Sequence, residues 1–467
     1  MNAATVSIMT KKERKEENKE FLLLLVKTVF PLLIQALFMQ SINFIDQIMV
    51  SSLGTQAVAA IGASNKLMSI YNSFLYGSSS GCAMFLAQYW GKKDIKGLQR
   101  MVGLTLSVTV AMGTLFVALV IAIPEQLIGI FSDDPLVIAP AVDYMITVCA
   151  AYFLMSIIFP LNFMLRSMNK VKVTMTNTII SVLINCVVNY ILIYGKLGFP
   201  AMGVRGAAIA TVLCRVVELT ILILYIIFAD NPAFKNLKNC FSYNMEYVKG
   251  FVKKAVPLIG NEMMWSLGTT IYFIIYGKAG TDALAAMSIM QTLQMLAKIA
   301  TGGFCGASSI IVGNEIGKGD EEKVYRYCKK FHVAALVVGL VSAVAIVSLI
   351  NPMLALYDIE GTQVGKYVAE CMVVLSIYII MNSCNSINVE GIFRSGGDVG
   401  YVTLMDMGSI WFIGMPFTMI TGLILHMDVV VIYCAYLVLE VYKLILGHFR
   451  FKSGKWLHRL HKVGSQE

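Results

Sequence analysis

Charged residues are scarce in this chain of 467 residues: together they make up 14% of it, against about 25% in a typical soluble protein. Hydrophobic residues make up 57%. The apolar stretches are each long enough to cross about 30 Å of hydrocarbon, which takes roughly 20 helical residues. The weaker, alternating pattern of transmembrane strands is absent. The composition therefore excludes a soluble protein and predicts an all-α integral membrane protein.

Residues that bind metals or form disulfides are also sparse or badly spaced. The ten cysteines are scattered singly with no Cys-x-x-Cys pair, and of the five histidines only His332 lies in an apolar run. We therefore expect buried, unpaired cysteines and no resident cofactor. The formal charge of +9 comes from loops beside the apolar stretches, which indicates membrane topology rather than nucleic-acid binding.

The apolar stretches predict twelve transmembrane helices. Their expected ranges are 22–52, 55–88, 96–123, 136–165, 171–194, 204–229, 247–277, 281–313, 323–350, 362–391, 400–424 and 428–450. Lysine and arginine alternate between loops, so the positive-inside rule places both termini in the cytoplasm of a cell whose plasma (inner) membrane holds the protein. No cleavable signal is expected at the start.

The boundaries of the apolar stretches divide the chain into five parts. A polar tail at 1–21 precedes an N-terminal lobe of six helices at 22–229. A cytoplasmic linker at 230–246 leads to a C-terminal lobe of six helices at 247–450, and a basic cytoplasmic tail follows at 451–467.

The two halves of the chain repeat each other. At an offset of 226 residues, Pro31 aligns with Pro257 and Gly77 with Gly303; at an offset of 228, Arg166 aligns with Arg394. Duplications of this kind are typical of secondary transporters. They predict two six-helix lobes related by a pseudo-two-fold axis along the membrane normal.

Asp46 is the outstanding polar residue of the first span. It lies near the outer end of that span; a charge near the bilayer centre costs at least about 2.5–3.5 kcal/mol, so each charge inside the membrane needs a reason. Gln40, Asn43 and Asp46 recur every three residues and share one helix face. At offset 226 Asp46 becomes Tyr272, so the acid was not kept in the duplicate. An ion-coupling role is favoured; an ion pair with Lys66 is the structural alternative.

Two asparagines and a threonine extend this polar set in the first half. Asn185 and Asn189 are four residues apart and share a face of the fifth span, and Thr211 lies in the sixth. Oxygen ligands beside a carboxylate suit Na⁺ or a proton relay. Ordinary hydrogen bonding between helices is an equally good explanation.

The second half has charges of its own. Glu262 and Lys298 replace Ala36 and Asn72 of the first half, and their mutual neutralisation is plausible. Glu262, Lys298 and nearby Trp265 are candidates to line a substrate cleft, together with Gln40, Asn43 and Lys66 of the first half. Glu390 and Asp406 are interpreted as structural.

Several motifs, in this order, resemble the multidrug and toxic-compound extrusion (MATE) family over roughly residues 22–450. They are Pro31; Asp46-Gln47-Ile48-Met49-Val50-Ser51-Ser52-Leu53-Gly54; Ala57 to Ala60; Gly91-Lys92-Lys93-Asp94; Arg166-Ser167; Gly203 to Thr211; and Arg394-Ser395-Gly396-Gly397. The resemblance is strongest to the DinF-like branch.

The resemblance implies export of cationic, amphipathic organic compounds in exchange for H⁺ or Na⁺ by alternating access. It places a cation site, with Na⁺ as one candidate ion, at Asp46, Asn185 and Thr211. A second acid of that branch falls on Asn189 here, which is a departure that changes the charge of the site. The NorM-like acids of spans 7 and 10 fit poorly, since Glu262 lies earlier in its helix and the other position falls near Ser383.

Other classes of protein fit less well. A lipid-linked oligosaccharide flippase of the same superfamily commonly has more cationic residues in its cleft. A polytopic enzyme would need a reactive cluster near an interface, and a channel a ring of identical pore groups. We expect a non-enzymatic, monomeric exporter whose partners are small organic cations or drugs and membrane lipids, with no nucleic acid.

Overall fold

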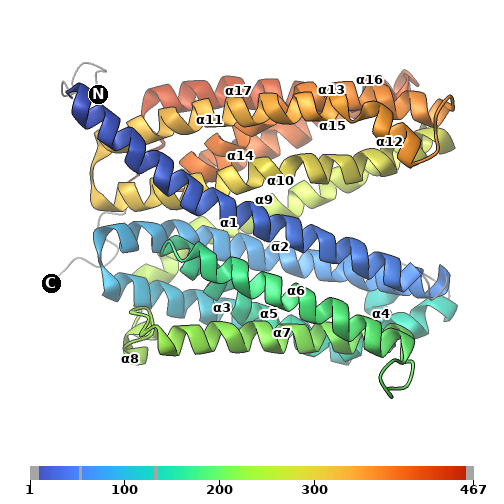
Figure 1. Ribbon diagram of the computed structural model, residues 1–467, viewed down its shortest axis with the longest axis horizontal. Helices are drawn as coiled ribbons and strands as arrows, with labels where there is room; N and C mark the ends of the chain where they lie inside the picture. Colours follow the sequence, from blue (N-terminus) through green and yellow to red (C-terminus); the bar gives the residue numbers. More distant parts are fainter. Residues whose placement is uncertain (1–9, 52–54, 131–134, 459–467) are drawn as a thin grey trace. The chain divides into compact units, whose positions relative to one another are not determined.

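The computed structural model describes the backbone of residues 10–51, 55–130 and 135–458. Side chains at 42–44, 46–48, 50–51, 55–59, 135–137 and 246 lie outside the described set. Long helices dominate the described chain (Figure 1), and this confirms the predicted all-α fold.

The first half of the chain forms six long helices and two short ones. They are α1 (Lys11–Ser51), α2 (Thr55–Lys92), α3 (Ile95–Ala122), α4 (Pro124–Gly129), α5 (Pro135–Ser167), α6 (Val171–Tyr194), α7 (Gly203–Phe228) and α8 (Leu237–Cys240). Most bounds lie within a few residues of the predicted ranges, and α6 matches its prediction at both ends.

The second half repeats the pattern with more irregular helices. They are α9 (Met245–Lys278), α10 (Thr281–Lys318), α11 (Glu321–Ser348), α12 (Ile350–Leu356), α13 (Gln363–Ser386), η1 (Ile387–Phe393), α14 (Val399–Met407), η2 (Gly408–Gly414), α15 (Met415–Met419), η3 (Ile420–Ile424), α16 (Val429–Tyr433) and α17 (Ala435–Ser453). The π-helical segments η1, η2 and η3 continue the neighbouring α-helices, so α13–η1 and α14–η3 each make one span. Such π-segments are frequent at functional sites.

Ten helical stretches of the described chain are long and apolar enough to cross a membrane. Two further helices, α2 with 38 residues and α9 with 34, are also long enough to cross a membrane. With them the described chain has twelve long helical stretches, the number of spans that the sequence predicts.

The duplication is visible in how the third helix of each half begins. Asp94 precedes α3 and accepts a hydrogen bond from the backbone nitrogen of Gly97 at 2.9 Å. Asp320, at offset 226, precedes α11 and accepts a hydrogen bond from the backbone nitrogen of Lys323 at 2.9 Å. A carboxylate at this position satisfies a backbone donor that has no partner inside the helix, so the repeated aspartate sets the same start twice.

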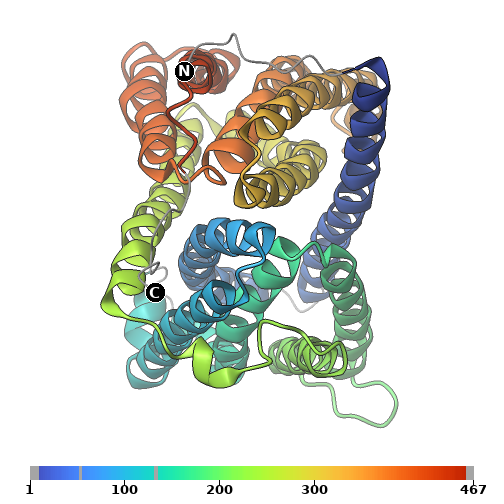
Figure 2. The same cartoon turned by 90° about the vertical axis from the view of Figure 1, so that its left-hand side faces the viewer.

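The helices form two compact units, and each unit contains the first part of one helix from the other sequence half. Among the described residues, one unit, called unit 1, contains 10–33 with 260–458, and the other, unit 2, contains those of 34–259. Figure 2 looks roughly along the helices of each unit. The first part of α1 therefore belongs with the C-terminal helices, and the first part of α9 with the N-terminal ones. The predicted lobes, 22–229 and 247–450, did not anticipate this exchange.

Two glycines at equivalent positions allow these exchanged segments to pack closely. A Cβ on Gly303 would lie 2.5 Å from Cδ2 of Leu33 in unit 1. A Cβ on Gly77 would lie 2.7 Å from Cα of Ile259 in unit 2. Leu33 and Ile259 are themselves 226 residues apart. The same close approach was thus kept in both copies.

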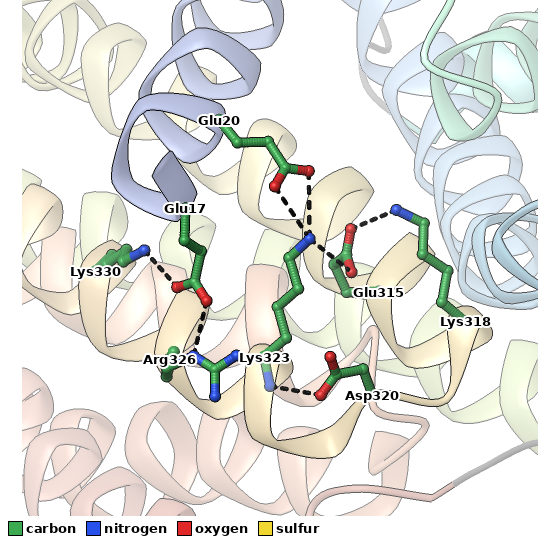
Figure 3. A network of polar contacts seen from close by, with 8 residues as sticks. All are labelled: Glu17, Glu20, Glu315, Lys318, Asp320, Lys323, Arg326 and Lys330. Atoms are coloured by element: carbon green, nitrogen blue, oxygen red, sulfur yellow. Dashed lines mark hydrogen bonds and ion pairs between the residues drawn. The ribbon is translucent and has the colours of Figure 1, made fainter. Parts of the chain in front are cut away.

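The start of α1 corrects the predicted polar tail at 1–21, because the helix begins at Lys11. Glu17 is buried and pairs with Arg326 at 2.9 Å and Lys330 at 2.7 Å on α11 (Figure 3). Phe21 packs edge-on against the rings of Tyr327 and Phe331. Charge pairing and aromatic packing with α11 hold this segment, so it is not a freely solvated tail.

The predicted linker and C-terminal tail are docked on their units where the structure describes them. Gln99 of α3 donates to the carbonyl of Pro232 in the linker at 2.7 Å. In unit 1 α17 continues to Ser453, and the following Trp456 is fully buried. Arg450 makes a two-bond ion pair with Asp398, at 2.6 and 2.9 Å. Neither segment behaves as a free tail.

Candidate functional site

The polar face of α6 in unit 2 holds the two predicted asparagines. Asn185 and Asn189 are both buried, and the amide nitrogen of Asn189 donates to the amide oxygen of Asn185 at 3.0 Å. A carbonyl oxygen has two lone pairs, so this bond leaves Asn185 oxygen able to accept from another donor or a cation.

Thr211 lies on α7, which packs against α6. The thiol of Cys214 donates a hydrogen bond to the carbonyl oxygen of Ser181 at 3.1 Å, and Gly206 lies against Leu192. These two contacts fix an antiparallel register that places Thr211 level with Asn185. The Thr211 hydroxyl donates to Ala207 carbonyl at 3.0 Å, so its oxygen remains available as an acceptor.

The remaining candidates of the first half are less well defined. Position 46 lies within α1, but the side chains of Asp46 and Asn43 lie outside the described residues. Gln40 is half-buried and Lys66 is exposed. Both the cation site around Asp46 and the alternative ion pair with Lys66 therefore stay predictions.

Sequence reasoning missed a buried junction in unit 2. Gln35 of α1 donates to the Thr178 hydroxyl on α6 at 2.7 Å and accepts from Arg166, at the end of α5, at 3.0 Å. The repeated Arg-Ser pair was the only signal in the sequence. This junction ties three helices together through one amide.

Unit 1 contains a denser set of charges in its interior. Glu262 of α9 pairs with Arg394, which directly follows η1, at 3.2 Å. The expected neutralisation of Glu262 by Lys298 is therefore wrong: the arginine of the repeated Arg-Ser motif is its partner. Nothing in the local sequence pairs residues 132 positions apart.

Asp406 of α14 and Glu440 of α17 also have partners. Asp406 pairs with Lys443 at 2.8 Å and accepts from Asn261 at 3.1 Å. Glu440 is buried and accepts from two asparagines of α13, at 3.0 and 2.7 Å. Buried carboxylates need such partners because burial removes their hydration. The interpretation of Asp406 as structural fits this pairing, while Lys443 and Glu440 were not singled out from the sequence.

Lys298, near the middle of α10, has a different environment. Its ammonium lies 5.8 Å from the ring centre of Trp265 and 5.4 Å from that of Tyr378. Among the described residues no carboxylate lies within 4.0 Å of it. A cation–π contact contributes about 0.5–2 kcal/mol, against about 2.5–3.5 kcal/mol for placing a lysine at this depth. Two such contacts contribute about 1–4 kcal/mol together, which is comparable with that cost, but they give the ammonium no direct anionic contact.

The fold and these interior polar groups define a class, that of helical membrane transporters built from two related units. The MatE family profile matches the chain twice, at residues 31–191 and 257–420. The chain therefore belongs to the MATE family of multidrug transporters and is not an enzyme. The two matches coincide with the two sequence repeats.

Similar proteins support this assignment along the whole chain. The chain is 23% identical to the uncharacterized transporter YisQ of Bacillus subtilis, over 96% of this chain and 97% of that protein. It is 27% identical to the probable multidrug resistance protein NorM of Halalkalibacterium halodurans, over 86% and 87%. An outward-facing multidrug resistance MATE family transporter of the MOP superfamily has the same fold, with a TM-score of 0.84 at 17% identity, over 92% of this chain and 96% of that one. The DinF-like assignment stays a prediction.

Proposed function

We propose that this protein exports amphipathic organic cations across the plasma membrane by alternating access, in exchange for H⁺ or Na⁺. Family membership and the multidrug resistance relatives support export of organic compounds. The observation that carries the coupling site is the buried Asn185–Asn189 pair, level with Thr211 across the α6–α7 contact. These oxygens lie in the unit that also contains position 46.

Ion and substrate act through the same conformational equilibrium. Each ligand shifts that equilibrium only by its difference in affinity for the two states. With Asn189 in place of a second acid, Asp46 is the single carboxylate of the proposed site, so one H⁺ or one Na⁺ would neutralise it. The oxygens of Asn185 and Thr211 would complete the coordination of Na⁺, which prefers hard oxygen ligands, whereas a proton needs only the carboxylate.

Counterflow of a cationic dye in proteoliposomes, with Na⁺ and pH gradients imposed separately, tests this proposal. Asp46→Asn should abolish gradient-driven export while Asp143→Asn, which removes an exposed acid on α5, leaves it unchanged. Thr211→Val distinguishes between the two coupling ions. If Na⁺ is the coupling ion, this variant should need a higher Na⁺ concentration for export. If H⁺ is the coupling ion, the export rate should stay unaltered.

Export at the wild-type rate by Asp46→Asn would refute the coupling role of this acid. Absence of dye movement in the wild-type protein under both gradients would refute drug export and favour the flippase alternative. Loss of export in Asp143→Asn as well would show that the assay reports stability rather than coupling.

A further inference from the structure

We propose that Lys298 binds a carboxylate of the exported compound, so that the substrates of this protein include amphipathic compounds with an acidic group. This inference rests on the proposed export function and narrows its substrates to amphipathic cations that also carry a carboxylate. The site consists of Lys298 and Gln294 on α10, Trp265 on α9 and Tyr378 on α13, all within unit 1.

The first step is the pairing of charges in unit 1. Arg394 and Lys443 each have a carboxylate partner, at 3.2 and 2.8 Å. Lys298 has none within 4.0 Å among the described residues, and the nearby Glu440 is already bonded to two asparagine amides. A cation in a low-dielectric interior calls for an anion; Glu440 and Glu390 attract Lys298 only at longer range, and no carboxylate of the described part of unit 1 contacts it directly.

The second step is the neighbouring donor. Gln294 lies one turn before Lys298 on the same face of α10. Its amide interacts with the Tyr378 hydroxyl, but its buried Nε2 makes no hydrogen bond of ordinary geometry among the described residues. An ammonium and an amide N–H together match the two oxygens of one carboxylate. A doubly charged phosphate would leave excess negative charge in this apolar setting.

The third step is the aromatic wall and its access. Trp265 is 46% exposed and lies against the Lys298 ammonium, while Tyr378, the second ring beside Lys298, is buried. Sites for small molecules typically combine such apolar surfaces with a few fixed polar groups. An amphipathic compound could place its rings against Trp265 and its carboxylate at Lys298.

The depth of Lys298 argues against a lipid headgroup as the anion. Residue 298 is near the middle of α10, a helix of 38 residues. At about 1.5 Å per residue, it lies roughly 25–30 Å along the helix from either end. Phosphates of the bilayer lie near the ends of a spanning helix, so they are out of reach.

The duplicate positions show that this site is specific to the second half. Gln294, Lys298 and Trp265 correspond to Met68, Asn72 and Met39 at offset 226. The first half thus has neither the cation nor the aromatic ring. Three of the four residues of the site therefore differ between the two copies.

The test compares two probes that differ only in the acid: a rhodamine with a free carboxylate and its methyl ester. Binding to the purified full-length protein is measured by fluorescence anisotropy. Lys298→Met should weaken binding of the free acid about tenfold or more, as expected for loss of a charge-assisted hydrogen bond, and change the ester less than about threefold. Lys298→Arg should retain the preference. Lys278→Met removes an exposed lysine at the end of α9 and should change neither.

Equal weakening of both dyes by Lys298→Met, or no effect on either, would overturn the proposal. If that variant does not fold, the wild-type preference and Gln294→Leu, which should weaken only the acid, decide the question. Failure of the wild-type protein to move either dye in proteoliposomes would contradict the export function, while the binding contrast would still test the carboxylate site.

Discussion

Replacing Glu17 with glutamine should lower the stability of unit 1 by about 2 kcal/mol. The carboxylate is only 9% exposed and bonds to Arg326 at 2.9 Å and to Lys330 at 2.7 Å. A hydrogen bond to a charged partner contributes about 1.5–3 kcal/mol and a neutral one about 0.5–1.5 kcal/mol. The substitution turns two bonds of the first kind into at best neutral-acceptor bonds, at a cost of about 1 kcal/mol each.

Glu20 provides the matched control on the same helix. It bonds to Lys323 at 3.2 Å, but its side chain is 50% exposed. Water screens such a pair, and exposed ion pairs contribute about 0.2–1 kcal/mol. Glu20→Gln should therefore cost about 0.5 kcal/mol. Figure 3 shows both acids facing the cations of α11; they differ in burial and in the number of their cationic partners, two for Glu17 and one for Glu20.

Thermal unfolding in detergent, followed by tryptophan fluorescence, measures the difference. At about 2–4 °C per kcal/mol for a unit of this size, Glu17→Gln should lower the midpoint by about 4–8 °C and Glu20→Gln by about 1–2 °C. High salt should reduce the Glu20 effect most, because screening acts on exposed charges. Equal shifts for the two variants would show that burial of Glu17 adds nothing.

Two further predictions concern close packing. Gly77→Ala should lower the free energy of unfolding by about 1–3 kcal/mol, because its new Cβ meets the backbone of Ile259. Gly303→Ala should lower it less, since the Leu33 side chain can turn away. Thermal midpoints of the two variants compare them, and a lower midpoint for Gly303→Ala would contradict the geometry. Trp456→Ala should lower the free energy of unfolding by about 3–5 kcal/mol, because it empties a fully buried site. The loss should appear as a lower thermal midpoint and yield, and Trp456→Phe should lose less. A wild-type midpoint for the alanine variant would show that the tail is not docked.

Helix positions could be predicted from the sequence because they depend on local composition. The apolar run at 171–194 ends at a left-handed Gly195, and the prediction and the structure agree at both ends. The start of α1 could not be predicted this way. Residues 11–20 are highly polar, and their helix is held by contacts with α11, about 300 residues away in the chain.

The part of the candidate site that depends on the spacing of residues along one helix could be predicted from the sequence. Four residues of separation put Asn185 and Asn189 on one face, and the structure bonds them. Partners across helices were not predictable, as the Glu262–Arg394 pair shows. Periodicity gives the face on which a side chain lies, but not the helix that this face meets.

The duplicated junctions indicate which features belong to the scaffold. In unit 2, Gln35 bonds to Thr178 and Arg166. In unit 1, the equivalent of Gln35 is Asn261, which donates to Asp406, the equivalent of Thr178 at offset 228. The two junctions join equivalent helices of the two units. This contact between helices within each unit is therefore part of the scaffold that both copies share.

What changed between the copies is the charge. Arg166 donates to a neutral amide in unit 2, whereas Arg394 donates to Glu262 in unit 1, and Asp406 there attracts Lys443 as well. Two of the acids that unit 1 added, Glu262 and Asp406, have a cationic partner within 4.0 Å, as the cost of a lone buried charge requires. Among the described residues Lys298 has no carboxylate at such a distance, and the buried Glu440 is bonded to asparagine amides instead. The two aromatic rings and the longer-range attraction of Glu440 and Glu390 leave Lys298 without a direct anionic contact, and this is why the substrate is the partner to test for it.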